Sequence, residues 1–579
     1  MRKISILPFI AAIPFMLVAC NADTQVSPTH QRKFHDEEEV RTLREVTLYG
    51  EKQAYPAPSV GTTRVFVVPI EFADYPADEI GKYYNSEIEY VGREDNYAIR
   101  HTDSTATGRG RDAARQDIWN IYFGDAEDTQ WESLKSYYEK SSYGKLHFEG
   151  LVADWYAPST SFERPDEHAT AAEWAANSSA KSLARKVIDY YSDDVAHHYD
   201  FFKDEKGEQL FHTGQEFLQY FDSDKDGCFD LIELVYSAPF NATDVAGGTF
   251  DAPIDNDVFW AYCGSSATGK ESVDRPTMSK YAFFSYYTFV ECGKLVFDEE
   301  KEKEKYEPWT CEEISRGDAK MDAHTLIHET GHAIGLPDYY DTDYSGKEAT
   351  GTVDMMDHNI GDHNSYSKTQ LGWVDPVVVT GPTEVTVRSF TDTGDCIMVP
   401  YRGFYNDHPG FGNTSNMEYL ALELYTPTGV NKFDSEHNYA GNYPLTPSVS
   451  GIKIYHVDSR LGICEWNGGN WKPIEYTDQI VGTSDYQCVK VANTNSGSTY
   501  KYTECFQLEF LQKFGVEKTV RNEVLYQRGD VFNGTDDEYA GFVMNETKGG
   551  EAEIEIPFGY KITIVECSSE SATILFEAC

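Results

Sequence analysis

The sequence is poor in positive charge. Its 49 lysine and arginine residues stand against 96 aspartate and glutamate residues, which gives a formal net charge of -47 at pH 7. Because such a surface repels phosphate groups, the composition disfavours a protein that binds nucleic acid or anionic lipid headgroups. Hydrophobic residues make up 40% of the 579 residues, so large cores are available. The length is sufficient for two or three domains.

Long hydrophobic runs are also scarce. The apolar run Ile4–Val18 follows two cationic residues and is too short to span a bilayer comfortably. It ends in Leu-Val-Ala-Cys at Cys20, which resembles the lipobox of bacterial lipoproteins. We therefore expect a signal peptide over 1–19, lipidation of Cys20 and a tether over 20–59. The folded part would be displayed on the extracellular face of a bacterial membrane, held only by this lipid anchor; ordinary secretion is the alternative.

Closely spaced cysteine pairs are missing as well. The ten cysteines other than Cys20 contain no CxxC-type spacing that would indicate a cysteine metal site. Their even number in an exported protein permits disulfides, but the sequence does not define the pairing, and free buried thiols are the alternative. No repeat indicates a solenoid.

One segment carries most of the chemical information. Residues 328–338 read His-Glu-Thr-Gly-His-Ala-Ile-Gly-Leu-Pro-Asp. On a helix, His328 and His332 lie one turn apart on one face, so both imidazoles can bind a single zinc ion. Glu329 lies beside them, where its carboxylate can accept a proton from a zinc-activated water. Gly335 is expected to end the helix, and the reversed chain can bring Asp338 back as the third ligand.

Two alternative ligand sets are weaker. A thermolysin-like site needs a glutamate on a second helix, but the nearest candidate, Glu348, lies in a stretch rich in glycine and threonine that is typical of a loop. His324 precedes His328 by one turn, but pairing these two would place Glu329 after the second ligand instead of between two ligands. We therefore interpret His324 as a packing residue or a support for the ligands.

A second acidic segment predicts a calcium site. Residues 222–233 fit the twelve-residue loop of an EF-hand, with glycine at position 6. The following run, Leu231–Tyr236, favours a strand over an exiting helix, so we expect a structural calcium clip and not a sensor. An acidic surface turn without an ion is the alternative. The predicted ligands are Asp222, Asp224, Asp226, the backbone carbonyl of Cys228, Asp230 and the bidentate Glu233.

These motifs together resemble a known family. Residues 328–338 are similar to the Asp-ended metzincin signature, and Met356 fits the methionine turn that lies below the metal in metzincins. The chain resembles the M6 peptidases, the immune inhibitor A-like metalloproteases, from about Val65 to about Asp458. The resemblance implies one catalytic zinc with Glu329 as the general base; Asp357 stands where the family more often has a small residue. Supporting segments are Ser142-Tyr143-Gly144-Lys145-Leu146, the acidic loop from Asp222, and Leu371-Gly372-Trp373.

The expected fold class is α+β. A valine-rich strand over 63–72 opens the folded part, and 145–155 indicates a hairpin. The charged run 298–305 is expected to form a solvated loop or a short exposed helix. We predict a metzincin-like catalytic domain over 60–376 and a β-rich region, in the form of a sandwich, over 377–579. Helical patterns occur over 113–121, 131–139 and 169–192, and a terminal hairpin over 561–577.

The leading hypothesis is an extracellular, membrane-tethered zinc endopeptidase that acts on proteins or peptides and not on nucleic acid. The alternative from another class is a catalytically inactive surface lipoprotein that serves binding or adhesion. Such a module has no need of Glu329. A purely structural zinc is disfavoured too, because structural sites normally close with four protein ligands and the sequence offers three.

Overall fold

The computed structural model describes the chain from residue 56 to residue 578 with internal gaps. The predicted signal peptide, Cys20, most of the tether and the rejected ligand Glu348 lie outside the described residues. Among the residues that are described, no helix combines the length and the apolar character needed to cross a bilayer. The longer stretches left out are 83–88, 91–96, 99–104, 240–258, 267–271, 341–348, 401–417, 478–485, 491–507, 514–521 and 533–559.

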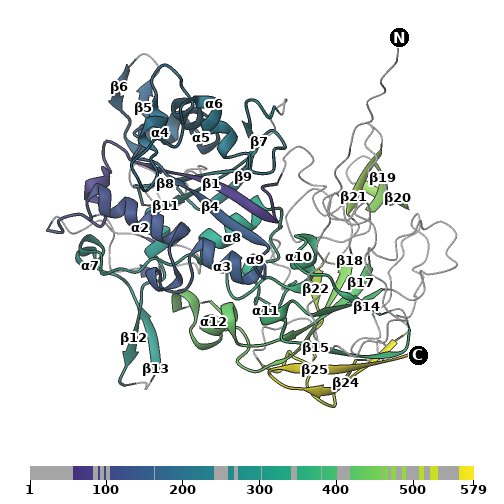
Figure 1. The fold of residues 1–579 in the computed structure, drawn as a ribbon. Helices are drawn as coiled ribbons and strands as arrows, with labels where there is room; N and C mark the ends of the chain where they lie inside the picture. Colours follow the sequence, from purple (N-terminus) through teal and green to yellow (C-terminus); the bar gives the residue numbers. More distant parts are fainter. Residues whose placement is uncertain are drawn as a thin grey trace, which may run out of the picture.

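A five-stranded sheet forms the centre of the N-terminal half (Figure 1). Its first four strands are mutually parallel, and β9 runs antiparallel at the edge of the described sheet. The central strands are buried on both faces, as expected of a parallel sheet covered by helices. The order is β4 (Leu146–Val152), β1 (Gly61–Ile70), β8 (Leu231–Tyr236), β11 (Lys280–Ser285) and β9 (Tyr262–Ser265).

Helices cover both faces of this sheet (Figure 1). Because successive side chains of a strand point to opposite faces, β8 sends Ile232 and Leu234 into one core and Leu231 and Val235 into the other. The first core lies under α4 (Ala171–Asn177), α5 (Ala180–Tyr191) and α6 (Gly214–Tyr220). The second lies under α2 (Arg111–Phe123), α3 (Leu134–Ser141) and α8 (His324–Ala333).

The C-terminal region consists largely of strands in two main sheets. Their facing residues, such as Leu422 and Ile454 of one sheet and Val387 and Ile574 of the other, form a single hydrophobic cluster. The first sheet is β14 (Val377–Val378), β16 (Cys396–Pro400), β17 (Glu418–Tyr425), β18 (Gly451–Asp458) and β22 (Leu508–Phe510). The second is β15 (Thr383–Arg388), β25 (Ser571–Ala578), β24 (Tyr560–Cys567) and β23 (Val531–Phe532).

The opposite side of the first C-terminal sheet does not face solvent. Met398, Ala421 and Tyr455 belong to the same hydrophobic cluster as Leu326 and Ile327 of α8. The β-rich region therefore shares a core with the helix that carries the zinc motif. The hydrophobic core around α8 therefore contains residues from both sides of the predicted domain boundary at residue 376.

The remaining helices and strands are short. They are η2 (Ala77–Glu79), β2 (Glu89–Tyr90), β3 (Tyr97–Ala98), η3 (Ala126–Asp128), β5 (Ser159–Ser161), β6 (Arg164–His168), η4 (His198–Phe201), β7 (Cys228–Phe229), β10 (Thr277–Met278), η6 (Tyr286–Val290), β12 (Lys294–Asp298), β13 (Lys303–Glu307), α7 (Cys311–Arg316), α9 (Met355–His358), α10 (Ser365–Gln370), α11 (Phe390–Thr393), η8 (Gly429–Asn431), α12 (Lys432–Glu436), η9 (Tyr439–Gly441), β19 (Leu461–Trp466), β20 (Trp471–Thr477) and β21 (Tyr486–Lys490).

Three local predictions differ from the structure. The helix expected over 169–192 is two helices, because Ser179 caps a new helix by accepting a hydrogen bond from the backbone N–H of Ser182. The hairpin expected over 145–155 is the single strand β4, which pairs in parallel with β1. The charged run 298–305 contributes Asp298 and residues 303–305 to an antiparallel pair, β12 with β13, in which Nζ of Lys305 lies 3.5 Å from Asp298.

Candidate metal centre and active site

The zinc motif lies on α8, whose ends follow from local chemistry. At its start, the carboxylate of Asp322 accepts a hydrogen bond from the backbone N–H of His324 at 3.0 Å. At its end, Gly335 has φ +108°, a conformation that glycine adopts without strain. The backbone N–H of Leu336 then bonds the carbonyl of Gly331 at 2.9 Å. The chain reverses there and returns towards the helix.

This reversal brings three side chains to one point. Nε2 of His328 and Nε2 of His332 each lie 3.1 Å from Oδ1 of Asp338. One ligand atom from each residue lies within 4.8 Å of the others. Two imidazole nitrogens and one carboxylate oxygen form a three-ligand donor set that leaves a fourth position open, as in catalytic zinc sites.

Backbone carbonyls orient both imidazoles. Nδ1 of His328 lies 2.8 Å from the carbonyl of Met355, and Nδ1 of His332 lies 2.7 Å from the carbonyl of Leu336. Since a carbonyl oxygen only accepts, each Nδ1 donates a proton to its carbonyl and each Nε2 is directed towards Asp338. The residues present thus fit a zinc ion in both donor type and orientation.

The charges of the site match this arrangement. Burial opposes protonation of His332, but the Asp338 carboxylate overrides it and raises the pKa of His332 to about 9. Burial likewise opposes ionisation of Asp338, yet the two imidazoles hold its pKa well below the usual range. Asp338 is therefore an anion at neutral pH, as a ligand for a divalent cation must be.

Glu329 lies on the same helix, facing the sheet edge. Burial raises the pKa of Glu329, while His328 and His332 oppose this shift. Its carboxylate also receives a hydrogen bond from the backbone of Cys263, in the edge strand β9. A carboxylate with a raised pKa, held next to the predicted metal, has the position and basicity required of a general base.

Met356 lies directly beneath the motif. It is fully buried in α9, and a Cβ atom built on Gly331 would lie 2.4 Å from its Sδ atom. Gly331 stands between the two ligand histidines, so the thioether fills the space that a larger residue would occupy. The structure thus places Met356 where a methionine turn is expected.

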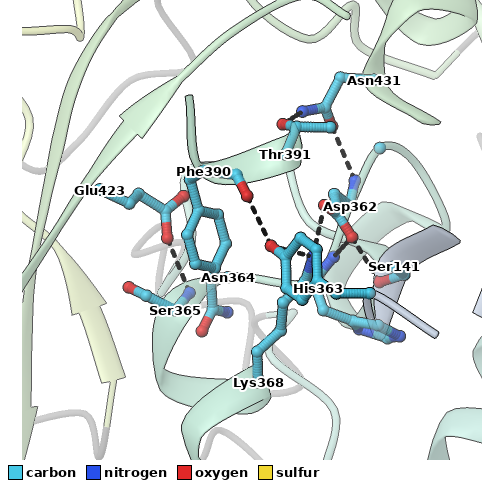
Figure 2. Close-up of polar contacts among 12 residues, drawn as sticks. Ser141, Asp362, His363, Asn364, Ser365, Lys368, Phe390, Thr391, Glu423 and Asn431 are labelled. Atoms are coloured by element: carbon cyan, nitrogen blue, oxygen red, sulfur yellow. Dashed lines mark hydrogen bonds and ion pairs between the residues drawn. The ribbon is translucent and has the colours of Figure 1, made fainter. Parts of the chain in front are cut away.

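A buried polar network holds the segment that follows this turn (Figure 2). Asp354 accepts hydrogen bonds from the backbone N–H groups of Met356 at 2.8 Å and Asn364 at 3.1 Å. The backbone N–H of Ser365 donates to Glu423 of β17 at 2.7 Å. Since the carbonyl of Met355 orients His328, hydrogen bonds and short backbone segments together connect the C-terminal sheet to a predicted zinc ligand.

The same network contains a buried ion pair. Nζ of Lys368 lies 2.6 Å from Oδ2 of Asp362, and both side chains are almost completely buried. Figure 2 shows Asp362 also accepting from Ser141 of α3, at 2.5 Å, and its backbone N–H bonded to Asn431 of η8, at 2.8 Å. Removal of either Lys368 or Asp362 would leave the other charge unpaired in the core.

Sequence reasoning missed Tyr340. Burial raises the pKa of its phenol, with further contributions from Asp338 and Glu329, and its ring lies 6.4 Å from that of His328. Its side chain also forms a hydrogen bond with Asp338. A signal was present, since Tyr340 follows Asp338 by two residues in the returning turn.

The two other histidines near the motif do not join the ligand group. His324 is completely buried between Asp322 and Asp434, with Nδ1 and Nε2 at 2.7 Å and 3.2 Å from the two carboxylates. Although burial opposes it, these anions raise the pKa of His324 to about 10. His358, which the sequence left outside the site, pairs with Asp357 at 2.5 Å.

The predicted calcium loop is formed only in part. Asp222, Asp224 and Asp226 come together, with one carboxylate oxygen of each within 4.8 Å of the others. Asp226 also accepts from the backbone N–H of Cys228 at 2.7 Å. Oδ1 of Asp222 is buried without a hydrogen-bond partner. Burial, reinforced by Asp226, raises the pKa of Asp222 to about 6.

The two last positions of the loop lie elsewhere. Asp230 accepts hydrogen bonds from the backbone N–H groups of Arg64 at 2.8 Å and Ser223 at 3.0 Å. Glu233 does not reach the aspartates, because residue 231 already begins β8 and the strand carries position 12 away from the loop. Its carboxyl is fully buried and accepts from Thr330 of α8 at 3.3 Å. Burial raises the pKa of Glu233 to about 8.

A comparison with known protein families identifies the family to which the chain belongs. The family model of the immune inhibitor A peptidase M6 catalytic domain matches residues 51–361. The chain belongs to the M6 peptidase family. The match includes α8, Asp338 and the methionine turn, and the family implies metallopeptidase activity. No curated protein matches the chain.

Proposed function

We propose that the protein is a zinc-dependent endopeptidase whose metal is held by His328, His332 and Asp338. The convergence of these three ligand atoms within 4.8 Å is the observation that carries the proposal. When bound, zinc supplies Lewis-acid chemistry: it polarises a peptide carbonyl and makes water more acidic. Glu329 accepts a proton from the attacking water and returns it to the leaving amine.

The edge strand β9 supports an endopeptidase in particular. It is the last strand of the described sheet, and its Cys263 touches the proposed base Glu329. An extended peptide can add to such an edge through main-chain hydrogen bonds, which do not depend on the ends of the substrate. Each ligand is held in place by a neighbour: Asp338 by Tyr340, His328 by the carbonyl of Met355, and His332 by the carbonyl of Leu336.

Two variants test this function. Glu329→Gln keeps the shape of the side chain and removes the proton acceptor, so zinc should stay bound while casein cleavage falls by about a thousandfold or more. His332→Ala should lose the zinc itself, measured by elemental analysis after dialysis. If Glu329→Gln cleaves casein within about tenfold of wild type, the base lies elsewhere or the protein is the inactive binding module.

We also propose that Asp222, Asp224 and Asp226 bind calcium in a structural role. The buried and unpartnered Oδ1 of Asp222 supports this, because an anionic oxygen without a donor is costly unless a cation neutralises it. The carbonyl of Cys228, at position 7 of the loop, is the further ligand that the sequence predicts. Asp230 and Glu233 are not part of this proposal, because neither belongs to the group of converging carboxylates: Asp230 accepts from Arg64, and Glu233 lies on β8 and accepts from Thr330.

The localisation of the protein is proposed from the sequence alone. Cys20 would be lipidated and would hold the enzyme outside the cytoplasmic membrane through the tether, with ordinary secretion as the alternative. Mass spectrometry of the mature N-terminus distinguishes the two outcomes. A diacylated Cys20 supports the anchor, and an unmodified N-terminus beyond residue 20 supports secretion.

A further inference from the structure

The edge strand that passes the proposed active site ends in a cluster of positive charge. β9 begins beside Glu329, where the backbone of Cys263 bonds the carboxylate, and it ends at Ser265. Two cations of α5 bind this end. Nζ of Lys181 donates to the carbonyl of Ser265 at 3.2 Å, and the guanidinium of Arg185 donates to Oγ of Ser266 at 2.5 Å.

The two cations act from one surface of one helix. Lys181 and Arg185 are four residues apart in α5, so their side chains leave the same face one turn apart. Lys280 adds a third cation from β11, with Nζ 2.9 Å from Oγ of Ser265. In a chain with a net charge of -47, Lys181 and Arg185 form a local positive surface at the end of β9, and the buried Lys280 adds a third positive charge behind it.

A cavity of about 210 Å³ opens beside this cluster. Arg185 and Arg275 contribute its positive charge, and Asp189 is the acidic residue in its lining. The Asp189–Arg275 pair is exposed and separated by 3.9 Å, so it neutralises Arg275 only weakly. Apolar side chains complete the wall, which suits the methylene groups of a glutamate: Ile188, Leu218, Pro276 and Met278.

The spacing relates this cluster to the reacting bond. A strand rises about 3.3 Å per residue, so the substrate residue beside Ser265 is about 7 Å along the chain from the residue beside Cys263. With the scissile bond beside Cys263, a peptide paired with β9 would bring the side chain of a residue two or three positions from that bond close to Lys181 and Arg185.

We propose that Lys181 and Arg185 form a subsite for an acidic side chain of the substrate, two or three residues from the scissile bond. This proposal rests on the proposed endopeptidase function and names the substrate class: extended peptides with Asp or Glu at that position. Arg185 is the principal determinant, because its guanidinium lies between the strand end and the cavity and can bind a carboxylate through two N–H groups.

The test uses the zinc-loaded full-length protein and internally quenched peptides. Each peptide carries one Glu, Gln or Lys at one of the positions on either side of a common scissile bond. We expect wild type to cleave the Glu peptide at least tenfold faster than the Lys peptide, in kcat/KM, at one position two or three residues from the bond. Arg185→Glu should reverse this preference at that position and at no other.

A neighbouring residue provides the matched control. Lys186→Glu makes the same kind of charge reversal on the same helix, but it points away from the face shared by Lys181 and Arg185. It should leave the Glu/Lys ratio within about twofold of wild type. Zinc content and a thermal melt verify that both variants are folded.

The outcomes separate this subsite from the function on which it rests. If wild type cleaves casein but Arg185→Glu keeps the wild-type Glu/Lys ratio at every position, the subsite is wrong and the endopeptidase stands. If Lys186→Glu changes the ratio as much as Arg185→Glu does, the effect is one of overall charge and the subsite is again wrong. A zinc-loaded wild type that cleaves neither casein nor any peptide overturns both proposals.

Discussion

Three histidines of α8 have different roles because their neighbours differ. His328 and His332 donate their Nδ1 protons to carbonyls and keep Nε2 for a metal. His324, one turn earlier on the same helix, has a carboxylate next to each ring nitrogen. Its ring also stacks on Trp131 and Tyr439, with ring centroids 4.0 Å and 4.2 Å away. At neutral pH it is therefore a structural cation without a lone pair for a metal.

This charge predicts a pH-dependent contribution of His324 to stability. Its folded pKa of about 10 lies above its ordinary value of 6.5, so the stabilisation is complete below pH 6.5 and is lost as the pH rises through 10. His324→Phe preserves the stacking but leaves Asp322 and Asp434 without a cation. We expect a loss of about 3 kcal/mol in the free energy of unfolding at pH 6.

Denaturant unfolding of both proteins at pH 6 and pH 10.5 measures this effect. The difference between wild type and His324→Phe should shrink at the higher pH, since His324 of the wild type is then mostly neutral. An equal difference at both pH values would show that packing, and not charge, accounts for the role of His324.

Gly331 provides a second prediction for a single residue. In an exposed helix, replacing glycine with alanine stabilises by about 1 kcal/mol through helix propensity. Here the new Cβ would lie 2.4 Å from Sδ of Met356, which is fully buried and has little room to move. Gly331→Ala should therefore weaken zinc binding by at least about tenfold, because it displaces the turn that orients His328.

A second substitution checks the cause. Met356→Ala in the Gly331→Ala background removes the clashing thioether, so the double variant should bind zinc more tightly than Gly331→Ala alone. Competition with a zinc chelator measures both affinities. No relief in the double variant would place the defect in the helix itself.

At the scale of elements, the acidic loop shows what a pattern leaves undetermined. The spacing of Asp222, Asp224 and Asp226 predicted a cluster, and the structure contains it. In an EF-hand, a helix after the loop turns position 12 back to the ion. Here β8 follows, and the alternation of the strand points Glu233 at Thr330 of α8. Whether a helix or a strand follows the loop thus determines which residues of the motif can bind the same ion.

The loop yields a prediction with an internal control. If the three aspartates bind calcium, saturating calcium should raise the melting temperature of wild type by several degrees, with zinc kept constant. Asp222→Asn should abolish most of this increase, because it removes the buried anionic oxygen. Glu233→Gln should keep the full increase. If instead Glu233→Gln loses it and Asp222→Asn keeps it, the twelve-residue ligand set is right and the structural interpretation is wrong.

Other elements show the same division between what the sequence predicts and what it does not. The helix of His328, the turn at Gly335 and the strand Leu231–Tyr236 are specified by local signals, and the structure has all three. The partner of β4 is not local, so a segment expected to form a hairpin pairs with β1 instead. Likewise, the contact of Cys263 with Glu329 has no motif, because it depends on how two distant segments pack.

At the scale of the whole molecule, the active site is not confined to the segment that the family model matches. The match ends at residue 361, but Glu423 and Asn431 hold the segment immediately beyond it (Figure 2). Residues of β16, β17 and β18 belong to the same core as α8. The β-rich region is therefore expected to be required for the catalytic unit itself and not only to extend it.

Truncation tests this dependence. A chain that ends at residue 376 would expose the apolar surface that Met398, Ala421 and Tyr455 cover, and Lys368 would lose the ring of Phe390, 4.9 Å away. We expect this chain to aggregate or to remain without a cooperative unfolding transition, because the stability of a domain is typically only about 5–15 kcal/mol and part of the core around α8 would be missing. Soluble expression, a thermal melt and zinc content of the truncated and full-length proteins measure the outcome. A truncated chain that melts cooperatively, keeps about one zinc and cleaves casein within about tenfold of full length would show that the first 376 residues form an independent catalytic domain.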